Sequence, residues 1–297
     1  MTPSAKLKRI ITKDNLELVG LLYEPKEKTN KVLVHVHGMC GNFYENKFID
    51  SIAETLTNNN VAFFVFNNRG CETFKDLVKV INGNKTYVRI GNAYEKFEES
   101  VFDIAAVIDF VSVSGFSEIH LSGHSLGSPK VAYYLKETKD NRVKSVLFLS
   151  PSDMLGLVRA NSDKFKKSLE EAIQKVAAGK GDQLLSQLVW DEYPLSAATY
   201  LNLFADDSKA AVFNFYKPLD TLDVISKITQ PLFAIMGKKD DALVVSIDET
   251  MERITKAANN SKKVETKILG DADHGYNGFE NELADAIKQW IQRLQLK

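Results

Sequence analysis

The sequence predicts an α/β protein whose mostly parallel sheet carries helices on both faces. Short apolar runs, such as residues 31–37 and 61–66, alternate with stretches whose apolar residues recur at helical spacing. Continuous apolar runs are typical of strands that are buried on both faces. Parallel strands need helical crossovers, so the alternation favours a parallel sheet. Such a sheet places ligand sites beyond the carboxyl ends of its strands.

The composition is that of an ordinary globular chain with a large core. Of the 297 residues, 44% are hydrophobic and 26% are charged. The formal net charge of -1 argues against nucleic acid or anionic membranes as partners. The N-terminal stretch predicts neither a signal peptide nor a membrane span. With Cys40 and Cys71 as the only cysteines, we expect two reduced thiols and a cytoplasmic location.

The first half of the chain contains most of the predicted strands. In chain order we expect a hairpin (6–12 and 16–23), a buried strand (31–37), a helix (46–57), a second buried strand (61–66), an irregular stretch (71–92), a helix (94–113), a strand from 118 that turns into a helix at 123–127, and a strand (143–149).

The regular alternation stops after residue 150. Residues 151–230 show helical patterns at 163–178, 183–188 and 195–204 but no convincing strand, so they predict an inserted helical cap. The alternation resumes with a strand (231–237), a helix (246–257), a strand (264–269) and a helix (279–294). We therefore expect a core domain of residues 1–152 and 226–297, and a cap of residues 153–225. The aromatic residues of the cap should mostly be buried, with a minority lining an apolar substrate pocket.

The motif Gly123-His124-Ser125-Leu126-Gly127 stands where a predicted strand turns into a helix. In a G-x-S-x-G turn of this kind the serine is exposed at the carboxyl end of its strand. Ser125 is therefore the candidate nucleophile. The N–H of Leu126 lies at a helix start, where unsatisfied amides favour an oxyanion.

A serine hydroxyl needs a base, and elimination leaves one histidine for that role. His35 and His120 lie inside strands, His37 ends one, and His124 adjoins Ser125 with its side chain directed elsewhere. His274 follows the nucleophile in the chain and lies in a loop after the last predicted strand. His274 is therefore the candidate general base.

The acid that orients the histidine should lie between Ser125 and His274 in the chain. Asp240 comes three residues after Gly237, where a predicted strand ends, and it is preferred over its neighbour Asp241. Asp271 and Asp273 are too near His274 in sequence and are expected to be solvated or capping residues.

An oxyanion hole needs a second amide besides that of Leu126. The loop His37-Gly38-Met39 follows a buried strand and supplies the N–H of Met39 as a candidate. Neither donor is a side chain, so substitution of Met39 should reshape the pocket more than the hole. Cys40 and Cys71 also fall in loops at this edge of the sheet, and we expect both to be small apolar filler.

Taken together, these motifs resemble the α/β-hydrolase superfamily in order and spacing over essentially the whole chain. The motifs are 123–127, His37-Gly38, 67–70, 237–240 and 273–275. The resemblance implies an eight-stranded, mostly parallel sheet, a lid after the sixth strand and a Ser125-His274-Asp240 triad. Asn67 and Asn68 stand where relatives commonly have an Asp, and a His-Gly-Gly-Gly oxyanion loop is absent from the sequence. Residues 150–153 and the cap are similar to a branch that includes siderophore esterases.

The resulting hypothesis is a serine hydrolase of the carboxylesterase kind, with no metal or organic cofactor. Its partner would be a small, partly apolar ester. A thioesterase, an amidase, an acyltransferase or a C–C hydrolase would use the same residues, because the substrate is chosen by the cap. Ser125 in place of an Asp argues against dehalogenase and epoxide hydrolase members. A non-catalytic small-molecule receptor on the same scaffold is a further alternative.

Overall fold

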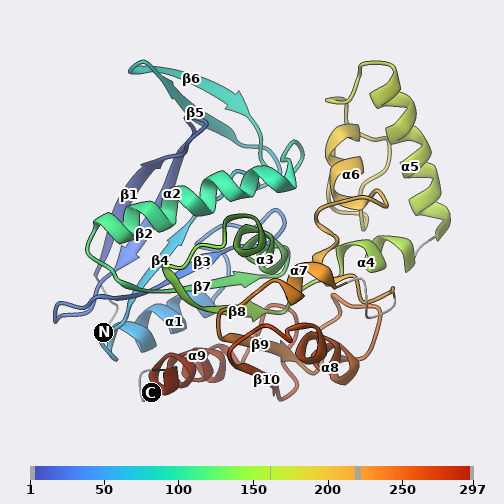
Figure 1. The fold of residues 1–297 in the computed structure, drawn as a ribbon. Coiled ribbons are helices and arrows are strands. Elements are labelled where there is room, and N and C mark those ends of the chain that lie inside the picture. Colours follow the sequence, from blue (N-terminus) through green and yellow to red (C-terminus); the bar gives the residue numbers. More distant parts are fainter. Residues whose placement is uncertain (1–3, 161, 218–221, 295–297) are drawn as a thin grey trace.

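The computed structural model describes residues 4–160, 162–217 and 222–294 (Figure 1). The predicted core and cap also include residues 1–3, 161, 218–221 and 295–297, which lie outside the described residues. The central sheet has eight strands in the order β1-β2-β4-β3-β7-β8-β9-β10. They are β1 (Ala5–Ile11), β2 (Glu17–Tyr23), β3 (Lys31–Val36), β4 (Ala62–Phe66), β7 (Glu118–His124), β8 (Val143–Leu149), β9 (Leu232–Gly237) and β10 (Val264–Leu269).

The mostly parallel sheet predicted from the sequence is confirmed. Strand β2 runs antiparallel to both of its neighbours, β1 and β4. The remaining neighbours in the sheet, β4-β3-β7-β8-β9-β10, all pair in parallel. Their carboxyl ends therefore meet at one edge, where the loops that contain the candidate site residues begin.

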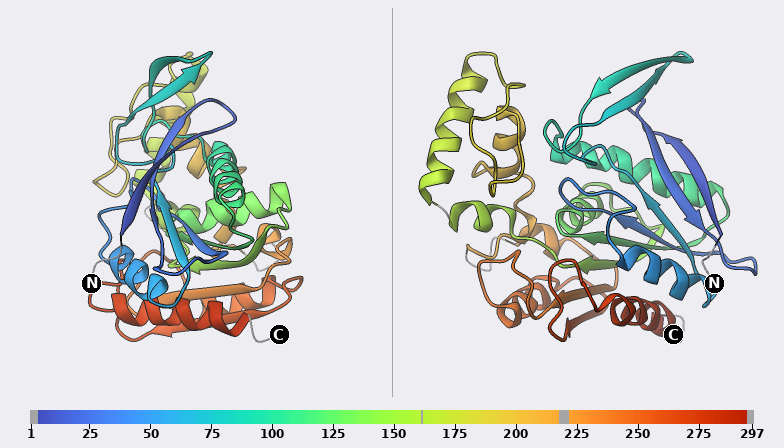
Figure 2. Two further views of the ribbon diagram at one scale, coloured as in Figure 1. Left: turned by 90° about the vertical axis from the view of Figure 1, so that its left-hand side faces the viewer. Right: turned by 180° about the vertical axis from the view of Figure 1, so that it is seen from behind.

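Alternate residues of the central strands enter two separate hydrophobic clusters. In β3, Val32 and Val34 belong to the first cluster and Leu33 to the second, as a side-chain period of two requires. The first cluster includes α2 (Ser100–Val113), α3 (Gly127–Thr138) and α8 (Ile247–Ala257). The second includes α1 (Phe48–Thr57) and α9 (Glu280–Leu294), which lie side by side in Figures 1 and 2. Burial on both faces accounts for the continuous apolar runs.

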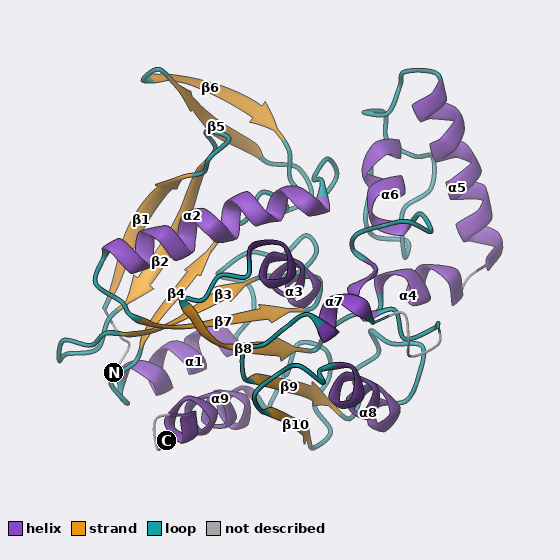
Figure 3. Ribbon diagram, in the orientation of Figure 1, coloured by secondary structure: helices purple, strands orange, loops and turns teal. Residues whose placement is uncertain are grey.

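Between β8 and β9 the chain leaves the sheet for a helical segment (residues 154–226). Its helices are α4 (Met154–Ala160), α5 (Ser162–Ala177), α6 (Ala197–Phe204), the 3-10 turn η2 (Ala211–Phe213) and α7 (Asp223–Ser226). In Figure 3, α5 and α6 stand beside each other, away from the sheet. The predicted helices at 163–178 and 195–204 correspond to α5 and α6, whereas α4 was not predicted.

The helix predicted at residues 183–188 is wrong. The main chain there pairs with residues 195–197 instead. The N–H of Leu185 donates to the carbonyl of Leu195 at 2.9 Å, and the N–H of Ala197 donates to the carbonyl of Gln183 at 2.9 Å. A six-residue stretch is too short to form a helix without support, so tertiary pairing decides its conformation.

The irregular stretch predicted at residues 71–92 is also wrong in part. It contains a separate antiparallel hairpin of β5 (Asp76–Ile81) and β6 (Asn84–Arg89). The turn residues Asn82 and Gly83 have φ values of 50° and 78°. Asn-Gly is the preferred pair for a two-residue turn with positive φ at both positions, and this local signal was available in the sequence. Further glycines nearby, such as Gly91, made the whole stretch look irregular in the sequence.

None of the helices in the described ranges combines the length and apolar character needed to cross a membrane.

Candidate active site

Ser125 occupies a sharp turn between β7 and α3. Its φ of 53° is a left-handed value that residues with a Cβ rarely adopt. The N–H of Ser125 donates to the carbonyl of Leu149 at 3.0 Å, which ties the turn to β8. A Cβ on Gly127 would lie 2.2 Å from the carbonyl oxygen of Val36, so the close approach of α3 to β3 requires glycine. Strained backbone of this kind clusters at functional sites.

His274 and Asp240 come together from the loops after β10 and β9. The Nδ1 atom of His274 lies 2.9 Å from Oδ1 of Asp240, which also accepts from the N–H of Ala242 at 3.0 Å. Burial raises the pKa of Asp240, but the hydrogen bond and charge of His274, together with hydrogen bonds from Ser150 and the N–H of Ala242, outweigh burial and leave this pKa lowered. Because an ionised carboxylate only accepts, Nδ1 carries the hydrogen and Nε2 is left as the basic nitrogen.

The other candidate carboxylates, Asp241, Asp271 and Asp273, do not hydrogen-bond to the side chain of His274. Asp241 is exposed and lines the adjacent cavity. Asp271 pairs with Lys239 at 3.0 Å. Asp273 accepts from the N–H of Asn277 at 2.9 Å and so caps its own turn. Of these four residues, Asp240 is the one that contacts His274.

Ser125 and His274 line the same cavity, which has a volume of about 760 Å³. Gly38, Met39 and Trp190 also line it. Among the described residues, neither Oγ of Ser125 nor Nε2 of His274 has a hydrogen-bond partner. Catalytic hydrogen bonds often tighten only when a substrate binds, so a serine and a histidine that line one cavity and have these two atoms not hydrogen-bonded are compatible with a nucleophile and its base.

The two predicted oxyanion donors come from the residue after the nucleophile and from the loop after β3. Leu126 directly precedes α3, and Met39 follows Gly38 in the loop after β3. A Cβ on Gly38 would lie 2.7 Å from Cβ of Ser125, so this loop runs directly against the nucleophile. The N–H groups of Met39 and Leu126 donate to no acceptor in the described part of the chain. Unsatisfied amides at such a position can bind an anion.

His37 and Asn68 hold the loop that contains Met39. Both stand in motifs that the sequence analysis named, but it assigned neither of them this role. Nδ1 of His37 lies 2.9 Å from the carbonyl oxygen of Gly38, and Nε2 accepts from the N–H of Asn68 at 3.0 Å. Burial, together with the charge of Lys130, lowers the pKa of His37 to about 3, so the ring is neutral. Both residues follow adjacent parallel strands, β3 and β4, and this was the available signal.

A buried ion pair lies behind Asn68. Nζ of Lys130 is 2.7 Å from Oε2 of Glu95, and both side chains are fully buried. Nζ of Lys130 also donates to Oδ1 of Asn68 at 3.3 Å. The pair therefore adjoins the hydrogen bonds that fix the loop after β3.

His124 supports the loop that contains His274, the candidate base. Its Nε2 atom lies 2.8 Å from the carbonyl oxygen of His274. Burial, followed by the neighbouring His274, lowers the pKa of His124 to about 4. The side chain of His124 is thus bound to the His274 loop, and His124 also lines the cavity that contains Ser125. The strand histidines have structural partners: Nδ1 of His35 contacts Ser122 at 3.0 Å, and Nδ1 of His120 contacts Ser145 at 2.8 Å.

Acidic groups dominate the charge of the 760 Å³ cavity. The described residues that line it include no lysine or arginine, and its carboxylates are Glu45, Glu72, Glu192 and Asp241. Among the aromatic residues of the helical segment, Trp190 and Tyr193 line this cavity, whereas Tyr200, Phe204, Phe213 and Phe215 are buried.

The two cysteines are not bonded to each other. Cys40 and Cys71 are both free, and burial raises the pKa of each thiol. Cys71 is fully buried. In the ranges that the structure describes, no three His, Cys, Asp or Glu side chains come together to hold a metal ion.

Solved structures that resemble this chain include several esterases and other hydrolases. Est1E from Butyrivibrio proteoclasticus, with bound ferulic acid, is 18% identical with a TM-score of 0.67 over 97% of this chain and 99% of its own. The siderophore hydrolase EstB from Aspergillus fumigatus is 17% identical with a TM-score of 0.71 over 98% of both chains. The Pyrococcus furiosus esterase Pf2001 is 18% identical with a TM-score of 0.63 over 98% of this chain and 91% of its own.

At these identities the similarity shows the fold, which is that of an α/β hydrolase. None of the curated proteins matches the sequence. A family described as "Protein of unknown function (DUF1749)", which is α/β-hydrolase-like, matches residues 80–295. Because this match covers well over half of the sequence, the chain belongs to the DUF1749 family.

Proposed function

We propose that this chain is a serine hydrolase that cleaves a carboxylic ester through an acyl-enzyme on Ser125. His274 is the general base, Asp240 orients it, and the N–H groups of Met39 and Leu126 bind the oxyanion. The observation that carries the proposal is the hydrogen bond from His274 to buried Asp240, in a histidine that lines one cavity with a serine of strained backbone.

Acylation uses these groups in a fixed order. Oγ of Ser125 bonds to the acyl carbon while Nε2 of His274 takes the hydroxyl proton, and the carbonyl electron pair moves to the oxygen, which the two amides stabilise. The tetrahedral intermediate then collapses. The bond to the alkoxy oxygen breaks, and this leaving group takes the proton from His274.

Deacylation repeats the same chemical steps with water as the nucleophile. His274 removes a proton from water as the oxygen bonds to the acyl carbon. Collapse of the second intermediate expels Ser125, which recovers its proton, and releases the carboxylic acid. Asp240 stabilises the imidazolium in both halves without itself taking up the proton.

We assign the role of a substrate-selecting cap to residues 153–225. Support comes from Met154, Leu157 and Trp190, which line the same cavity as Ser125. We place the protein in the cytoplasm, because two unpaired cysteines suit a reducing compartment.

Labelling with a fluorophosphonate probe tests the nucleophile directly. We expect a single adduct on Ser125, located by intact mass and peptide mapping, and no adduct on Ser125→Ala. Absence of an adduct on folded wild-type protein would contradict the proposal and favour a receptor. Parallel assays of an ester, a thioester and an amide with one acyl group then identify the leaving group, because all three reactions use the same residues.

A further inference from the structure

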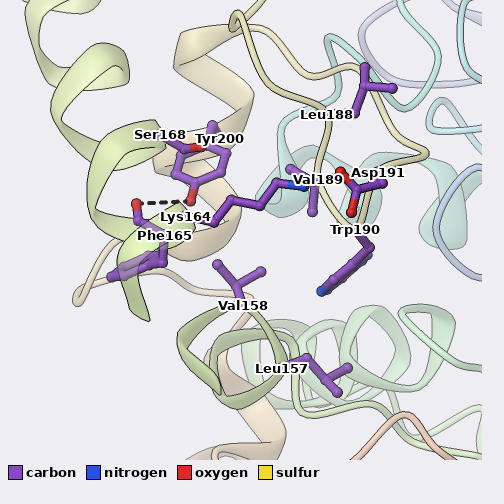
Figure 4. A pocket seen from close by; sticks show the side chains of 10 residues that line it. All are labelled: Leu157, Val158, Lys164, Phe165, Ser168, Leu188, Val189, Trp190, Asp191 and Tyr200. Carbon is purple, nitrogen blue, oxygen red and sulfur yellow. Dashed lines mark hydrogen bonds and ion pairs between the residues drawn. The ribbon is translucent and has the colours of Figure 1, made fainter. Parts of the chain in front are cut away.

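A second cavity of about 300 Å³ lies within the helical segment (Figure 4). Side chains from α4, α5, α6 and residues 188–191 surround it. Its apolar walls are formed by Leu157, Val158, Phe165, Val189, Trp190 and Tyr200. We call this cavity the inner chamber, and the 760 Å³ cavity that contains Ser125 the active-site cavity.

The inner chamber adjoins the active-site cavity. Leu157 and Trp190 line both. These two side chains therefore form the partition between the active-site cavity and the inner chamber, which lies among the helices of the helical segment and is partly open to solvent. One substrate molecule could therefore place its ester at Ser125 and extend an attached group past Leu157 and Trp190 into the inner chamber.

The partition depends on an unusual turn. Trp190 and Asp191 have φ values of 50° and 62°, and the N–H of Glu192 donates to the carbonyl of Val189 at 3.1 Å. A turn with positive φ at both central positions favours Asn and Gly and disfavours a bulky residue such as Trp. The turn nevertheless holds the indole of Trp190 edge-on to Tyr193 and Phe204, with ring centroids 6.1 and 6.0 Å apart. Strain at a ligand-facing residue is a reason to infer function there.

The charges at the inner chamber are already compensated. Nζ of Lys164, on α5, pairs with the carboxylate of Asp191. The Tyr200 hydroxyl lies 3.4 Å from the carbonyl oxygen of Phe165. No unpaired cation remains among the described lining residues to hold an anionic group. The chamber is therefore suited to an uncharged, apolar occupant.

We propose that the inner chamber binds an apolar group of the ester, an alkyl chain or an aromatic ring of about ten non-hydrogen atoms at roughly 30 Å³ for each. The proposal rests on the proposed function, with the ester itself at Ser125. The group belongs either to the acyl half or to the alcohol half of the substrate, and the experiment separates the two.

The test compares short and long esters in two arms. The acyl arm uses p-nitrophenyl acetate and p-nitrophenyl octanoate, and the alcohol arm uses methyl acetate and octyl acetate. We expect the long ester to have the higher kcat/KM in one arm. Val158 lines the inner chamber and not the active-site cavity, so Val158→Phe should lower kcat/KM for that long ester about tenfold or more and leave the short ester within about twofold.

Ile173→Phe is the matched control, because Ile173 lies on α5 but is 52% exposed and outside the chamber. Ser168→Leu, which also fills the chamber, replaces Val158→Phe if that variant fails to fold. Equal losses on short and long esters, or no loss with either filling variant, would overturn the proposal.

A binding measurement keeps the inference separate from the proposed function. Ser125→Ala protein is titrated with octyl acetate and p-nitrophenyl octanoate, and tryptophan fluorescence is recorded. The chain has two tryptophans, so a signal that disappears in Trp190→Phe reports on the partition. If wild-type Ser125 takes no fluorophosphonate but this signal persists and Val158→Phe removes it, the proposed function fails and the chamber assignment stands. If Ser125 is labelled but both esters leave the fluorescence unchanged, the chamber assignment fails alone.

Discussion

The Nε2 atom of His124 lies 2.8 Å from the main-chain carbonyl oxygen of His274. A carbonyl oxygen only accepts, so Nε2 carries the hydrogen and donates it. The centroids of the two imidazole rings are 5.0 Å apart, and the ring centroid of Phe48 lies 5.1 Å from that of His124. The residue before the candidate nucleophile thereby fixes the loop of the candidate base.

We expect His124→Leu to lower kcat for an ester about 10- to 100-fold with little change in KM, because His274 would lose its main-chain anchor. His124→Gln retains an N–H donor and should lose much less. Steady-state kinetics on both variants, with thermal unfolding as the control for folding, provide the comparison. Equal losses in the two variants would show that the hydrogen bond does not position the base.

The buried histidines should make the protein sensitive to acid. The pKa of His124 is about 4 in the folded chain, against an ordinary value of 6.5, because burial disfavours its charged form. Between these values the unfolded chain binds a proton that the folded chain excludes, so the free energy of unfolding decreases as pH falls. For His124 this loss amounts to about 2–3 kcal/mol by pH 4.5.

His124→Gln removes this titration and keeps the donor. Urea unfolding of wild type and variant at several pH values from 7.5 to 4.5 should therefore show a weaker pH dependence in the variant, by about 2–3 kcal/mol over the range. Parallel curves for the two proteins would contradict the assigned pKa.

The sequence predicts best those features that depend on local patterns. The run Val32 to Val36 predicts a doubly buried strand, because its alternate residues enter two cores. Asp240 and His274 are predictable as neighbours, because each follows the end of a strand in one parallel sheet. The ordering of nucleophile, acid and base then leaves few alternatives.

Long-range partners are the part that sequence patterns do not reveal. Asn68 meets His37 because β3 and β4 pair with Val36 opposite Phe66, a register that no local pattern specifies. From the sequence, Lys130 would be expected at the surface, because lysine is almost never fully buried unless it is paired. Its partner Glu95 lies in a different part of the chain, so the pair is recognised only in the folded structure.

The Lys130–Glu95 ion pair should show strong energetic coupling. Lys130→Met leaves the carboxylate of Glu95 buried without a partner, and we expect it to lower the free energy of unfolding by about 3–5 kcal/mol. Adding Glu95→Leu removes that stranded charge, so the double variant should be more stable than Lys130→Met alone. A double-mutant cycle by urea unfolding measures the coupling. Additive effects of the two substitutions would refute it.

The carboxylates around the active-site cavity should select against anionic esters. Glu45, Glu192 and Asp241 line the cavity, and no lysine or arginine does so among the described residues. A carboxylate on the substrate would therefore approach like charges. The repulsion is long-range and falls as added salt screens it, with a Debye length of about 10 Å at 0.1 M.

The comparison uses p-nitrophenyl valerate and the p-nitrophenyl monoester of succinic acid, which are close in size and differ in charge. We expect kcat/KM at low ionic strength to be about tenfold lower for the anionic ester, because two repulsive contacts of about 1 kcal/mol together amount to more than a factor of ten. The difference should shrink as NaCl is added and in Glu192→Gln. Glu252→Gln is the control, because Glu252 lies on α8 and pairs with Lys256 on the exposed surface. An anionic ester that reacts as fast as the neutral one at low salt would mean that these carboxylates do not face the bound substrate.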